Sequence, residues 1–210
     1  MPSKAKENIL KKIRQALVTP VTIPFAESGD RGNVFHAPTQ DLDITFAEAF
    51  TKLQGQFAFC FDHAEMVEQL QVLAERKQWT KLFCNQPVLK QLFGKYNWPL
   101  DWYNQLADCQ ASITTCEALV ARTGTMILSS IASGGRTPSV YAPVHICIAY
   151  TSQLVYDVRD GLEMLQEKYG AELPSLISFA SGPSRTADIE KTLVTGVHGP
   201  KEVFCFLVEG

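Results

Sequence analysis

The sequence has six cysteines but no Cys-x-x-Cys pair and no ferredoxin-like run of cysteines. Iron–sulfur clusters and structural zinc sites generally use closely spaced thiols, so we expect this chain alone to bind neither of them. Cys60, Cys147 and Cys205 lie inside apolar runs, which predicts that they are buried and inert. Cys109 and Cys116 lie closer to loops, where a reactive thiol is a minor alternative.

Long apolar segments, basic excess and a nucleotide-binding loop are also missing. No stretch is suited to span a bilayer and the N-terminus lacks the apolar core of a signal peptide, so we expect a cytoplasmic protein. A net charge of −3 argues against a nucleic-acid partner. The absence of G-x-x-x-x-G-K-[ST] gives no indication of Walker-type nucleotide binding.

The first part of the chain differs from the rest. Residues 4–17 predict an amphipathic helix, whose short apolar stripe favours docking to protein over binding to a membrane. Residues 19–40 are rich in proline and glycine and predict an irregular arm. We therefore divide the chain into residues 1–40, an N-terminal helix and arm, and residues 41–210, an α/β domain.

The remaining residues alternate between apolar strand-like runs and helical patterns. Strands are expected at 57–61, 81–84, 126–130, 145–150 and 203–208. Helices are expected near 42–53, at 63–78, in a short segment from Pro87, and at 152–169. This order predicts an α/β fold, with a mostly parallel sheet and helices on both faces.

The segment Ser181–Pro200, SGPSRTADIEKTLVTGVHGP, is the densest in residues with special chemistry. The apolar runs on either side predict two strands flanking a short helix, which Ser181 and Ser184 can cap. Free backbone N–H groups at the start of a helix, the hydroxyls and the Arg185 guanidinium would together bind a small anion. An ordinary capped helix with a chance arginine is the alternative.

Two other loops carry glycines and hydroxyls that suit an anion. In open α/β sheets, ligands bind beyond the carboxyl ends of strands, where we expect all three loops to converge. The predicted ligand-binding residues are Thr123, Gly124, Thr125, Gly134, Gly135, Arg136, Ser184, Arg185 and Thr186.

Acids and histidines near these loops are the candidates for catalysis. Glu117 and Asp188 are candidate catalytic acids, although solvated helix charges are an equal alternative for Asp188 and Glu190. His198, enclosed by glycines, is the candidate for proton transfer. His145 begins an apolar strand and is expected to be a hydrogen-bonded structural histidine. The spacing of these residues defines no metal site.

SGPSRTADIE followed by GVHGP resembles the lactate-utilisation protein C family, whose members contain a LUD domain. ITTCEALVARTGTMILSS at 113–130 and the Pro143–His145 strand entry agree with this resemblance. The resemblance implies a fold similar to the sugar-phosphate isomerase and CoA-transferase group. It also implies two iron–sulfur partner proteins and a role in oxidising L-lactate to pyruvate. A glutamate commonly precedes the Thr-Gly-Thr turn in this family, whereas this chain has Arg122.

The resemblance favours a cluster-free subunit of a lactate-oxidising system that binds a small anion and iron–sulfur proteins. On this hypothesis the clusters belong to the partners and the chain binds no cofactor of its own. One alternative is a stand-alone transferase or ligase acting on a phosphorylated, CoA-linked or folate substrate. Another is a regulatory module without catalysis. Whether the chain is an enzyme by itself, and whether it self-associates, stays open.

Overall fold

A computed structural model of the chain describes residues 4–18, 37–187 and 193–210. The chain divides into two units, Met1–Ala37 and Pro38–Gly210. The first contains α1 (Lys4–Val18), a helix in which every residue is exposed. Its apolar stripe includes Ile9, Ile13 and Leu17, as the sequence pattern predicted. Among the described residues, no helix has the length and hydropathy needed to cross a bilayer.

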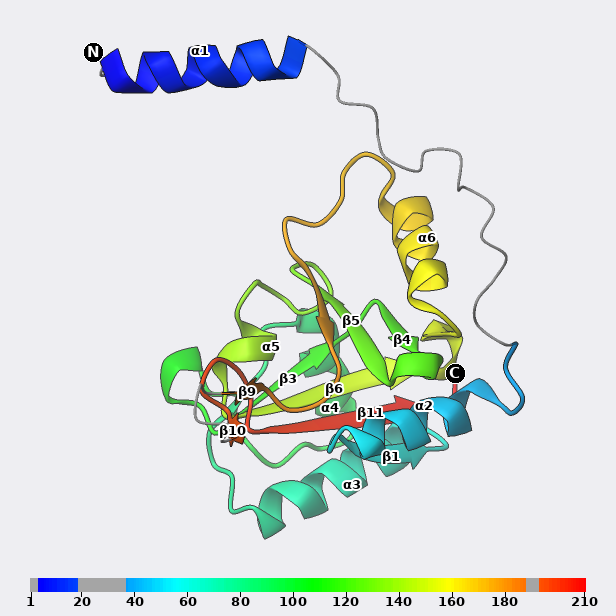
Figure 1. The fold of residues 1–210 in the computed structure, drawn as a ribbon. Helices are drawn as coiled ribbons and strands as arrows, with labels where there is room; N and C mark the ends of the chain where they lie inside the picture. Colours follow the sequence, from blue (N-terminus) through cyan, green and yellow to red (C-terminus); the bar gives the residue numbers. More distant parts are fainter. Residues whose placement is uncertain (1–3, 19–36, 188–192) are drawn as a thin grey trace. The chain divides into compact units, whose positions relative to one another are not determined.

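The second unit is built on a five-stranded sheet in which all neighbouring strands are parallel (Figure 1). In spatial order its strands are β1 (Gln56–Cys60), β11 (Glu202–Val208), β6 (Val144–Tyr150), β3 (Ala111–Thr115) and β2 (Leu82–Phe83). The inner strands β11, β6 and β3 are rich in β-branched, aromatic and cysteine side chains that are buried on both faces, as is typical of parallel sheets. The strand predicted at 145–150 is confirmed as β6, which lies in the middle of the sheet.

One face of this sheet is covered by two helices, α3 (His63–Arg76) and α4 (Pro87–Lys95). The Asp62 carboxylate caps α3 by accepting a hydrogen bond from the Glu65 backbone N–H. Met66 and Leu70 project from α3 into the core, and Pro87 starts α4. Both helices confirm the sequence prediction.

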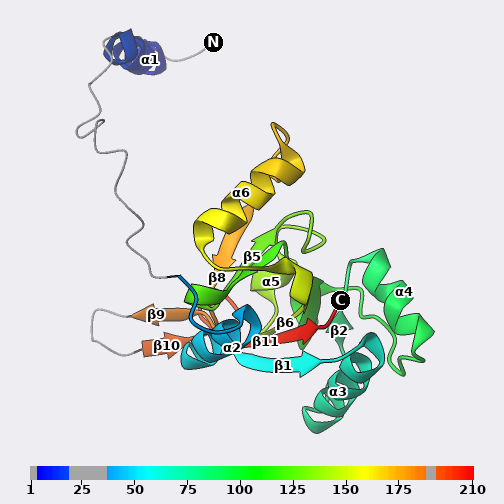
Figure 2. The ribbon, with the colours of Figure 1, turned by 90° about the vertical axis from the view of Figure 1, so that its right-hand side faces the viewer.

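The other face is covered mainly by a second sheet with strand order β7, β4, β5, β8 (Figure 2). Its strands are β7 (Leu154–Val155), β4 (Ala118–Val120), β5 (Thr125–Ser129) and β8 (Ile177–Ala180). Two helices, α2 (Leu42–Lys52) and α5 (Pro138–Tyr141), also lie on this side of the parallel sheet, and α6 (Val158–Tyr169) packs on the outer face of the second sheet. Short 3-10 helices span Leu106–Asp108, Ala121–Thr123 and Thr151–Gln153. The predicted α/β fold is confirmed, but helices alone do not cover both faces.

The predicted helix after Ser181–Pro183 is wrong for the residues that the structure describes. β9 (Arg185–Ala187) and β10 (Leu193–Thr195) pair there as an antiparallel hairpin. Two backbone hydrogen bonds fix its base, from the Ser184 N–H to the Pro200 carbonyl and from the Gly196 N–H to the Ser184 carbonyl, both 2.9 Å. These bonds join distant residues, so a local capping pattern did not reveal them.

The helix predicted at 152–169 starts later, at Val158. The Asp157 side chain accepts a hydrogen bond from the Arg159 N–H and so fixes the first turn of α6. The preceding residues form a 3-10 turn and the short strand β7, which pairs with β4. Pairing with a distant strand therefore overrides the helical pattern at this end.

All six cysteines are buried and free, which confirms the prediction for Cys60, Cys147 and Cys205. Hydrogen bonding to Cys147 and burial raise the pKa of the Cys116 thiol well above its ordinary value. Burial likewise raises the pKa of Cys109. A raised thiol pKa disfavours the nucleophilic thiolate, so the geometry gives no support to a reactive cysteine at these positions.

Candidate functional site

Two of the three predicted ligand loops meet through their hydroxyl groups. The Thr123 Oγ1 donates to the Thr125 Oγ1 at 2.8 Å, and the Thr125 hydroxyl lies 2.6 Å from the Ser181 Oγ. Thr125 is almost fully buried, whereas Ser181 is exposed. The chain of hydroxyls thus runs from the protein interior to the start of the SGPSR segment.

Both of these loops pack against the C-terminal end of α2. Gly124 has a φ of +57°, and a Cβ at this position would lie 2.4 Å from the backbone nitrogen of Phe50. A Cβ on Gly182 would lie 2.5 Å from the Leu53 carbonyl oxygen. Only glycine permits such close backbone contacts, so these residues bring the loops and the helix together.

Arg185 is anchored at the same end of α2. Its Nη2 donates a hydrogen bond to the Leu53 carbonyl oxygen at 2.7 Å, which provides a partner for a carbonyl at the end of the helix. Arg185 is exposed, and β9 begins at this residue. The contact with α2 therefore fixes the direction of a cationic side chain at the surface.

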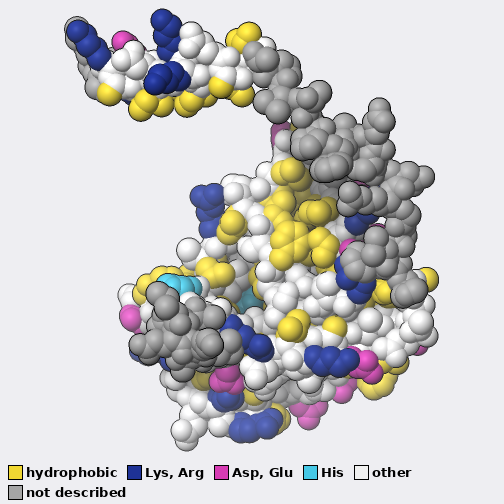
Figure 3. Space-filling view, in the orientation of Figure 1, with side chains coloured by type: hydrophobic (Ala, Val, Ile, Leu, Met, Phe, Trp, Pro, Cys, Tyr) yellow, Lys and Arg dark blue, Asp and Glu magenta, His cyan; other side chains and the backbone are white. Residues whose placement is uncertain are grey.

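The Gly196–Pro200 turn lies beside Ser184. A Cβ on Gly199 would lie only 2.9 Å from the Ser184 Cβ, so this glycine is needed for the close approach. His198 and the following Lys201 are exposed. We call Ser181, Ser184, Arg185, His198 and Lys201 the basic loop surface. On the face in Figure 3, a histidine and basic side chains lie beside the grey residues.

Thr186, another predicted ligand residue, lies within the hairpin, where it pairs with Val194 of β10. It is half-buried. Asp188 and Glu190 lie outside the described residues.

His145 is buried in the central strand, in agreement with the structural role predicted for it. Its Nε2 lies 2.8 Å from the Thr114 Oγ1 on β3. Burial lowers the pKa of His145 to about 4 from an ordinary value of 6.5. The imidazole is therefore neutral at neutral pH, and it is not available at the surface for a ligand.

The third predicted loop does not join the other two, so the predicted convergence is wrong. β5 and β8 are antiparallel, with Met126 opposite Ala180 at one end and Ser129 opposite Ile177 at the other. The Thr123–Thr125 turn and Ser181 lie at the first end. The loop of Gly134, Gly135 and Arg136 lies at the second.

Contacts with neighbouring backbone hold this third loop in place. The Arg136 Nη2 donates to the Ser175 carbonyl at 2.9 Å, and the Gly134 carbonyl accepts from the Asn85 Nδ2 at 2.9 Å. Arg136 and Arg185 therefore lie at different ends of the β5–β8 pair. They do not face one common crevice.

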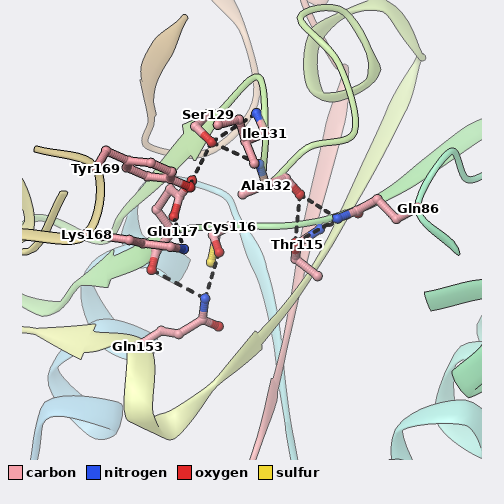
Figure 4. Close-up of polar contacts among 10 residues, drawn as sticks. All are labelled: Gln86, Thr115, Cys116, Glu117, Ser129, Ile131, Ala132, Gln153, Lys168 and Tyr169. Atoms are coloured by element: carbon pink, nitrogen blue, oxygen red, sulfur yellow. Dashed lines mark hydrogen bonds and ion pairs between the residues drawn. The ribbon is translucent and has the colours of Figure 1, made fainter. Parts of the chain in front are cut away.

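Glu117 is the predicted acid that the structure places in a defined network (Figure 4). Its side chain is fully buried and accepts hydrogen bonds from the Lys168 Nζ and the Tyr169 hydroxyl, both at 2.8 Å, and from the Ser129 hydroxyl. Burial raises the pKa of Glu117, but the donors Lys168, Ser129 and Tyr169 more than offset it, so the pKa lies below its ordinary value. The carboxylate is ionised and fastens α6 to the second sheet.

The same network continues across the C-terminal ends of β3 and β5. The Gln86 Nε2 donates to the Thr115 hydroxyl at 2.9 Å and to the Ala132 carbonyl at 2.6 Å. The Ser129 Oγ accepts hydrogen bonds from the backbone N–H groups of Ile131 and Ala132. These contacts, also drawn in Figure 4, fix the loop that leads to Gly134.

Sequence reasoning missed Gln86, Ser129, Lys168 and Tyr169 as members of this network. Tyr169 lies 52 residues from Glu117 along the chain, and Gln86 lies 29 residues from Thr115. No short motif contains both members of such pairs. Ser129 shares the segment 113–130 with Glu117, but at no spacing that indicates pairing. Lys168, in the last turn of an expected helix, indicates helix stabilisation rather than pairing with Glu117.

Arg122 stands where the resembled family commonly has glutamate, and the structure gives it a partner. Its Nε lies 2.8 Å from the Asp157 carboxylate, the group that also caps α6. The Arg122 guanidinium lowers the pKa of Asp157 below its ordinary value. Within the described ranges, no group of three or more histidine, cysteine or acidic side chains is arranged to hold a metal ion.

Comparison with known proteins shows which domain and which proteins this chain resembles. Residues 44–208 match the model of the LUD domain. Lactate utilization protein C of Exiguobacterium is 26% identical over 220 aligned positions, which cover 97% of this chain and 95% of that protein. The counterpart in Geobacillus is 29% identical, and its alignment covers 80% of this chain and 68% of that protein.

Other similarities are more local or concern the fold alone. The uncharacterized protein NMB1437 of Neisseria meningitidis is 32% identical, but the alignment covers 50% of this chain and only 44% of that protein. A crystal structure of a DUF162 family protein from Deinococcus radiodurans has a TM-score of 0.58 and 20% identity, covering 80% of this chain and 96% of that chain. The LUD domain match covers residues 44–208, which is most of the chain. Together with the shared fold, this match establishes that the chain belongs to the LUD domain family.

Proposed function

We propose that the chain is a cluster-free subunit of an L-lactate utilisation system and binds a small anion together with iron–sulfur partner proteins. The observation that carries this proposal is the similarity to lactate utilization protein C of Exiguobacterium, which extends over nearly the whole of both chains. Similarity of this extent includes the N-terminal unit as well as the LUD domain.

The basic loop surface is the proposed site for the anion. Arg185 offers a guanidinium in a fixed orientation, and Ser181 and Ser184 offer hydroxyls close to it in sequence. Guanidinium and hydroxyl donors suit a carboxylate such as that of lactate or pyruvate. Thr123, Gly124 and Thr125 would position Ser181 from beneath. Gly134, Gly135 and Arg136 lie too far along the β5–β8 pair to complete this site.

His198 is the proposed group for proton transfer at this site. Oxidation of lactate to pyruvate removes two electrons and two protons, one of them from the hydroxyl group. An exposed imidazole near the bound carboxylate can accept that proton. The electrons would pass to the clusters of the partner proteins. Glu117, with its oxygens already paired to Lys168, Tyr169 and Ser129, would serve the fold rather than the reaction.

Reconstitution tests the proposal. The purified chain would be combined with the iron–sulfur proteins of a lactate-utilisation system, and dye reduction by lactate would be measured. We expect activity only when both are present, and loss of activity with Arg185→Ala or His198→Gln. Robust lactate oxidation by the chain alone, or activity of the partners that does not depend on it, would contradict the proposal.

A thermal-shift screen distinguishes the alternatives. Lactate, pyruvate, phosphate, nucleotides, CoA and folates would each be added to the purified chain. A ligand at about one hundred times its dissociation constant stabilises the native state by roughly 2.7 kcal/mol. A selective shift with CoA, a nucleotide or a folate would instead favour a transferase or ligase. Full reconstituted activity of the Arg185 and His198 variants would favour a regulatory module.

A further inference from the structure

β1 is an edge strand with an apolar sequence, and its outer edge is unpaired among the described strands. β1 pairs with β11 on one side, and none of the described strands pairs with its other side. Phe57, Ala58 and Phe59 are only half-buried, and Phe61, directly after the strand, is 71% exposed. Figures 1 and 2 show β1 at the border of the sheet, between α2 and α3. Open apolar edges of this kind readily accept another strand.

A groove runs along this edge. It has a volume of about 390 Å³ and lies between β1 and α3, with Phe204 and Phe206 of β11 at its base. Ala58 lines the groove from the strand, and Val72 lines it from the helix. Val72 is 52% exposed, whereas the other large apolar side chains of α3, Met66, Val67, Leu70 and Leu73, are buried. The groove therefore extends the apolar edge onto the helix.

The residues around Val72 give the groove a self-complementary charge pattern. Glu68, Val72 and Arg76 lie one helical turn apart on α3, and all three are exposed and line the groove. Within the part of the chain that the structure describes, neither Glu68 nor Arg76 forms an ion pair. An antiparallel copy of this ridge centred on Val72 would place each Glu68 opposite an Arg76.

We propose that a second copy of this chain docks on the β1 edge through a two-fold axis. The two β1 strands pair antiparallel around Ala58, so that the two parallel sheets become one continuous sheet. The two α3 helices cross at Val72, and the Glu68 side chain of each copy meets Arg76 of the other. Strand pairing supplies the backbone contacts, and the charge pattern fixes the direction and register.

Light scattering on the full chain, over a range of concentrations, tests this interface. We expect a dimer for the wild type. Glu68→Arg or Arg76→Glu places like charges opposite each other at two symmetric positions, which should weaken dimerisation by about tenfold or more. The double variant Glu68→Arg with Arg76→Glu restores opposite charges and should recover the dimer. Because both side chains are exposed, none of these changes should alter the fold.

Glu167→Arg is the matched control, since Glu167 is exposed on α6 and does not line the groove. It makes the same charge change and should leave the dimer intact. A wild type that is monomeric at all concentrations would overturn the proposal. A dimer that tolerates both single reversals, or that the double variant fails to recover, would overturn it too.

Cross-linking tests the geometry independently. All six native cysteines are buried, so Val72→Cys adds an accessible thiol. A short bismaleimide should join two such chains efficiently, because the two thiols lie at the axis. Glu167→Cys, with an exposed thiol on α6, should give little dimer with the same reagent. Equal cross-linking of both variants would contradict the crossing at Val72.

Discussion

The Glu117 network and the basic loop surface contain similar polar side chains but differ in role. The network stabilises the fold, and the surface is the proposed ligand site. In the network, a buried carboxylate is surrounded by lysine, tyrosine and serine donors, and the remaining polar groups bind neighbouring backbone. On the basic loop surface, Arg185, His198 and Lys201 are exposed and lie beside hydroxyls. In the first region the carboxylate itself is fully buried, so a ligand cannot reach it. The second has cationic groups whose counter-charge is not supplied by a buried network.

In this chain, the segment that is dense in motif residues is the proposed ligand site, whereas the buried polar residues stabilise the fold. The buried acid is the sort of residue that attracts a catalytic assignment, yet its partners explain it as a fastening between α6 and the second sheet. Substitutions in the network should therefore alter stability. Substitutions on the loop surface should alter ligand binding while stability changes little.

The largest effect is expected for Glu117→Ala. Removing the buried carboxylate takes the acceptor away from the Ser129 and Tyr169 hydroxyls, at a cost of about 1–3 kcal/mol for each, whereas the Lys168 ammonium is partly exposed and can be hydrated. Chemical denaturation would measure the loss. Glu167→Ala, an exposed change on the same helix, should stay within about 0.5 kcal/mol of the wild type. A Glu117 variant as stable as this control would contradict a structural role.

Acid should destabilise the protein through His145. Because burial lowers its pKa to about 4 from 6.5, the unfolded chain takes up a proton at a higher pH than the folded chain does. The free energy of unfolding should therefore fall as the pH drops from 6.5 towards 4, by roughly 3 kcal/mol in total. His145→Gln should flatten the slope between about pH 6.5 and 5, above the titration of ordinary carboxylates. An unchanged slope would refute this origin.

Gly124→Ala should cost about 2 kcal/mol, because a Cβ would meet the backbone of Phe50 in a left-handed conformation. Thermal unfolding would show the loss as a lower Tm. Gly94→Ala is the matched comparison, since a Cβ there meets nothing within 4 Å and the residue lies in α4. That change should stabilise the protein by about 0.5–1 kcal/mol. Equal losses for both would mean that the contact with α2 is unimportant.

The smallest effect on stability is expected for Arg185→Ala, at most about 1 kcal/mol, because the side chain is exposed and loses one hydrogen bond to Leu53. Its effect on ligand binding should be larger, a loss of roughly tenfold to a hundredfold in affinity for a carboxylate. Calorimetric titration would measure it. Arg136→Ala, at the other end of the β5–β8 pair, should bind as the wild type does. The reverse result would move the site to the Gly134–Arg136 loop.

The sequence predicts best where local pattern and burial agree. FAFCF, HICIAY and VFCFLVE are continuous apolar runs, and all three become strands of the parallel sheet. The α3 pattern succeeds because Met66, Val67, Leu70 and Leu73 recur at helical spacing and face the core. In such segments the hydrophobic period alone determines the element.

Prediction fails where distant residues decide the structure. Ser181 and Ser184 look like helix caps, but Ser184 bonds to Gly196 and Pro200 and so starts a hairpin. The convergence of the three loops fails for a related reason. It assumed that all the strands share one parallel sheet, whereas β5 and β8 belong to a second, mixed sheet, in which they pair antiparallel. Two partners of Glu117, Lys168 and Tyr169, are separated from it by about fifty residues and follow no spacing rule.

The position of β11 has a consequence for how the chain folds during synthesis. β11 is the last strand in sequence, yet it lies between β1 and β6. Gln56 and Glu202, at the start of β1 and β11, contact each other across 146 residues. At a translation rate of about 5–20 residues per second, β1 stays without its neighbour for on the order of ten seconds. During that time both of its edges are open, so the nascent chain depends on slow long-range pairing and exposes an aggregation-prone strand until β11 emerges.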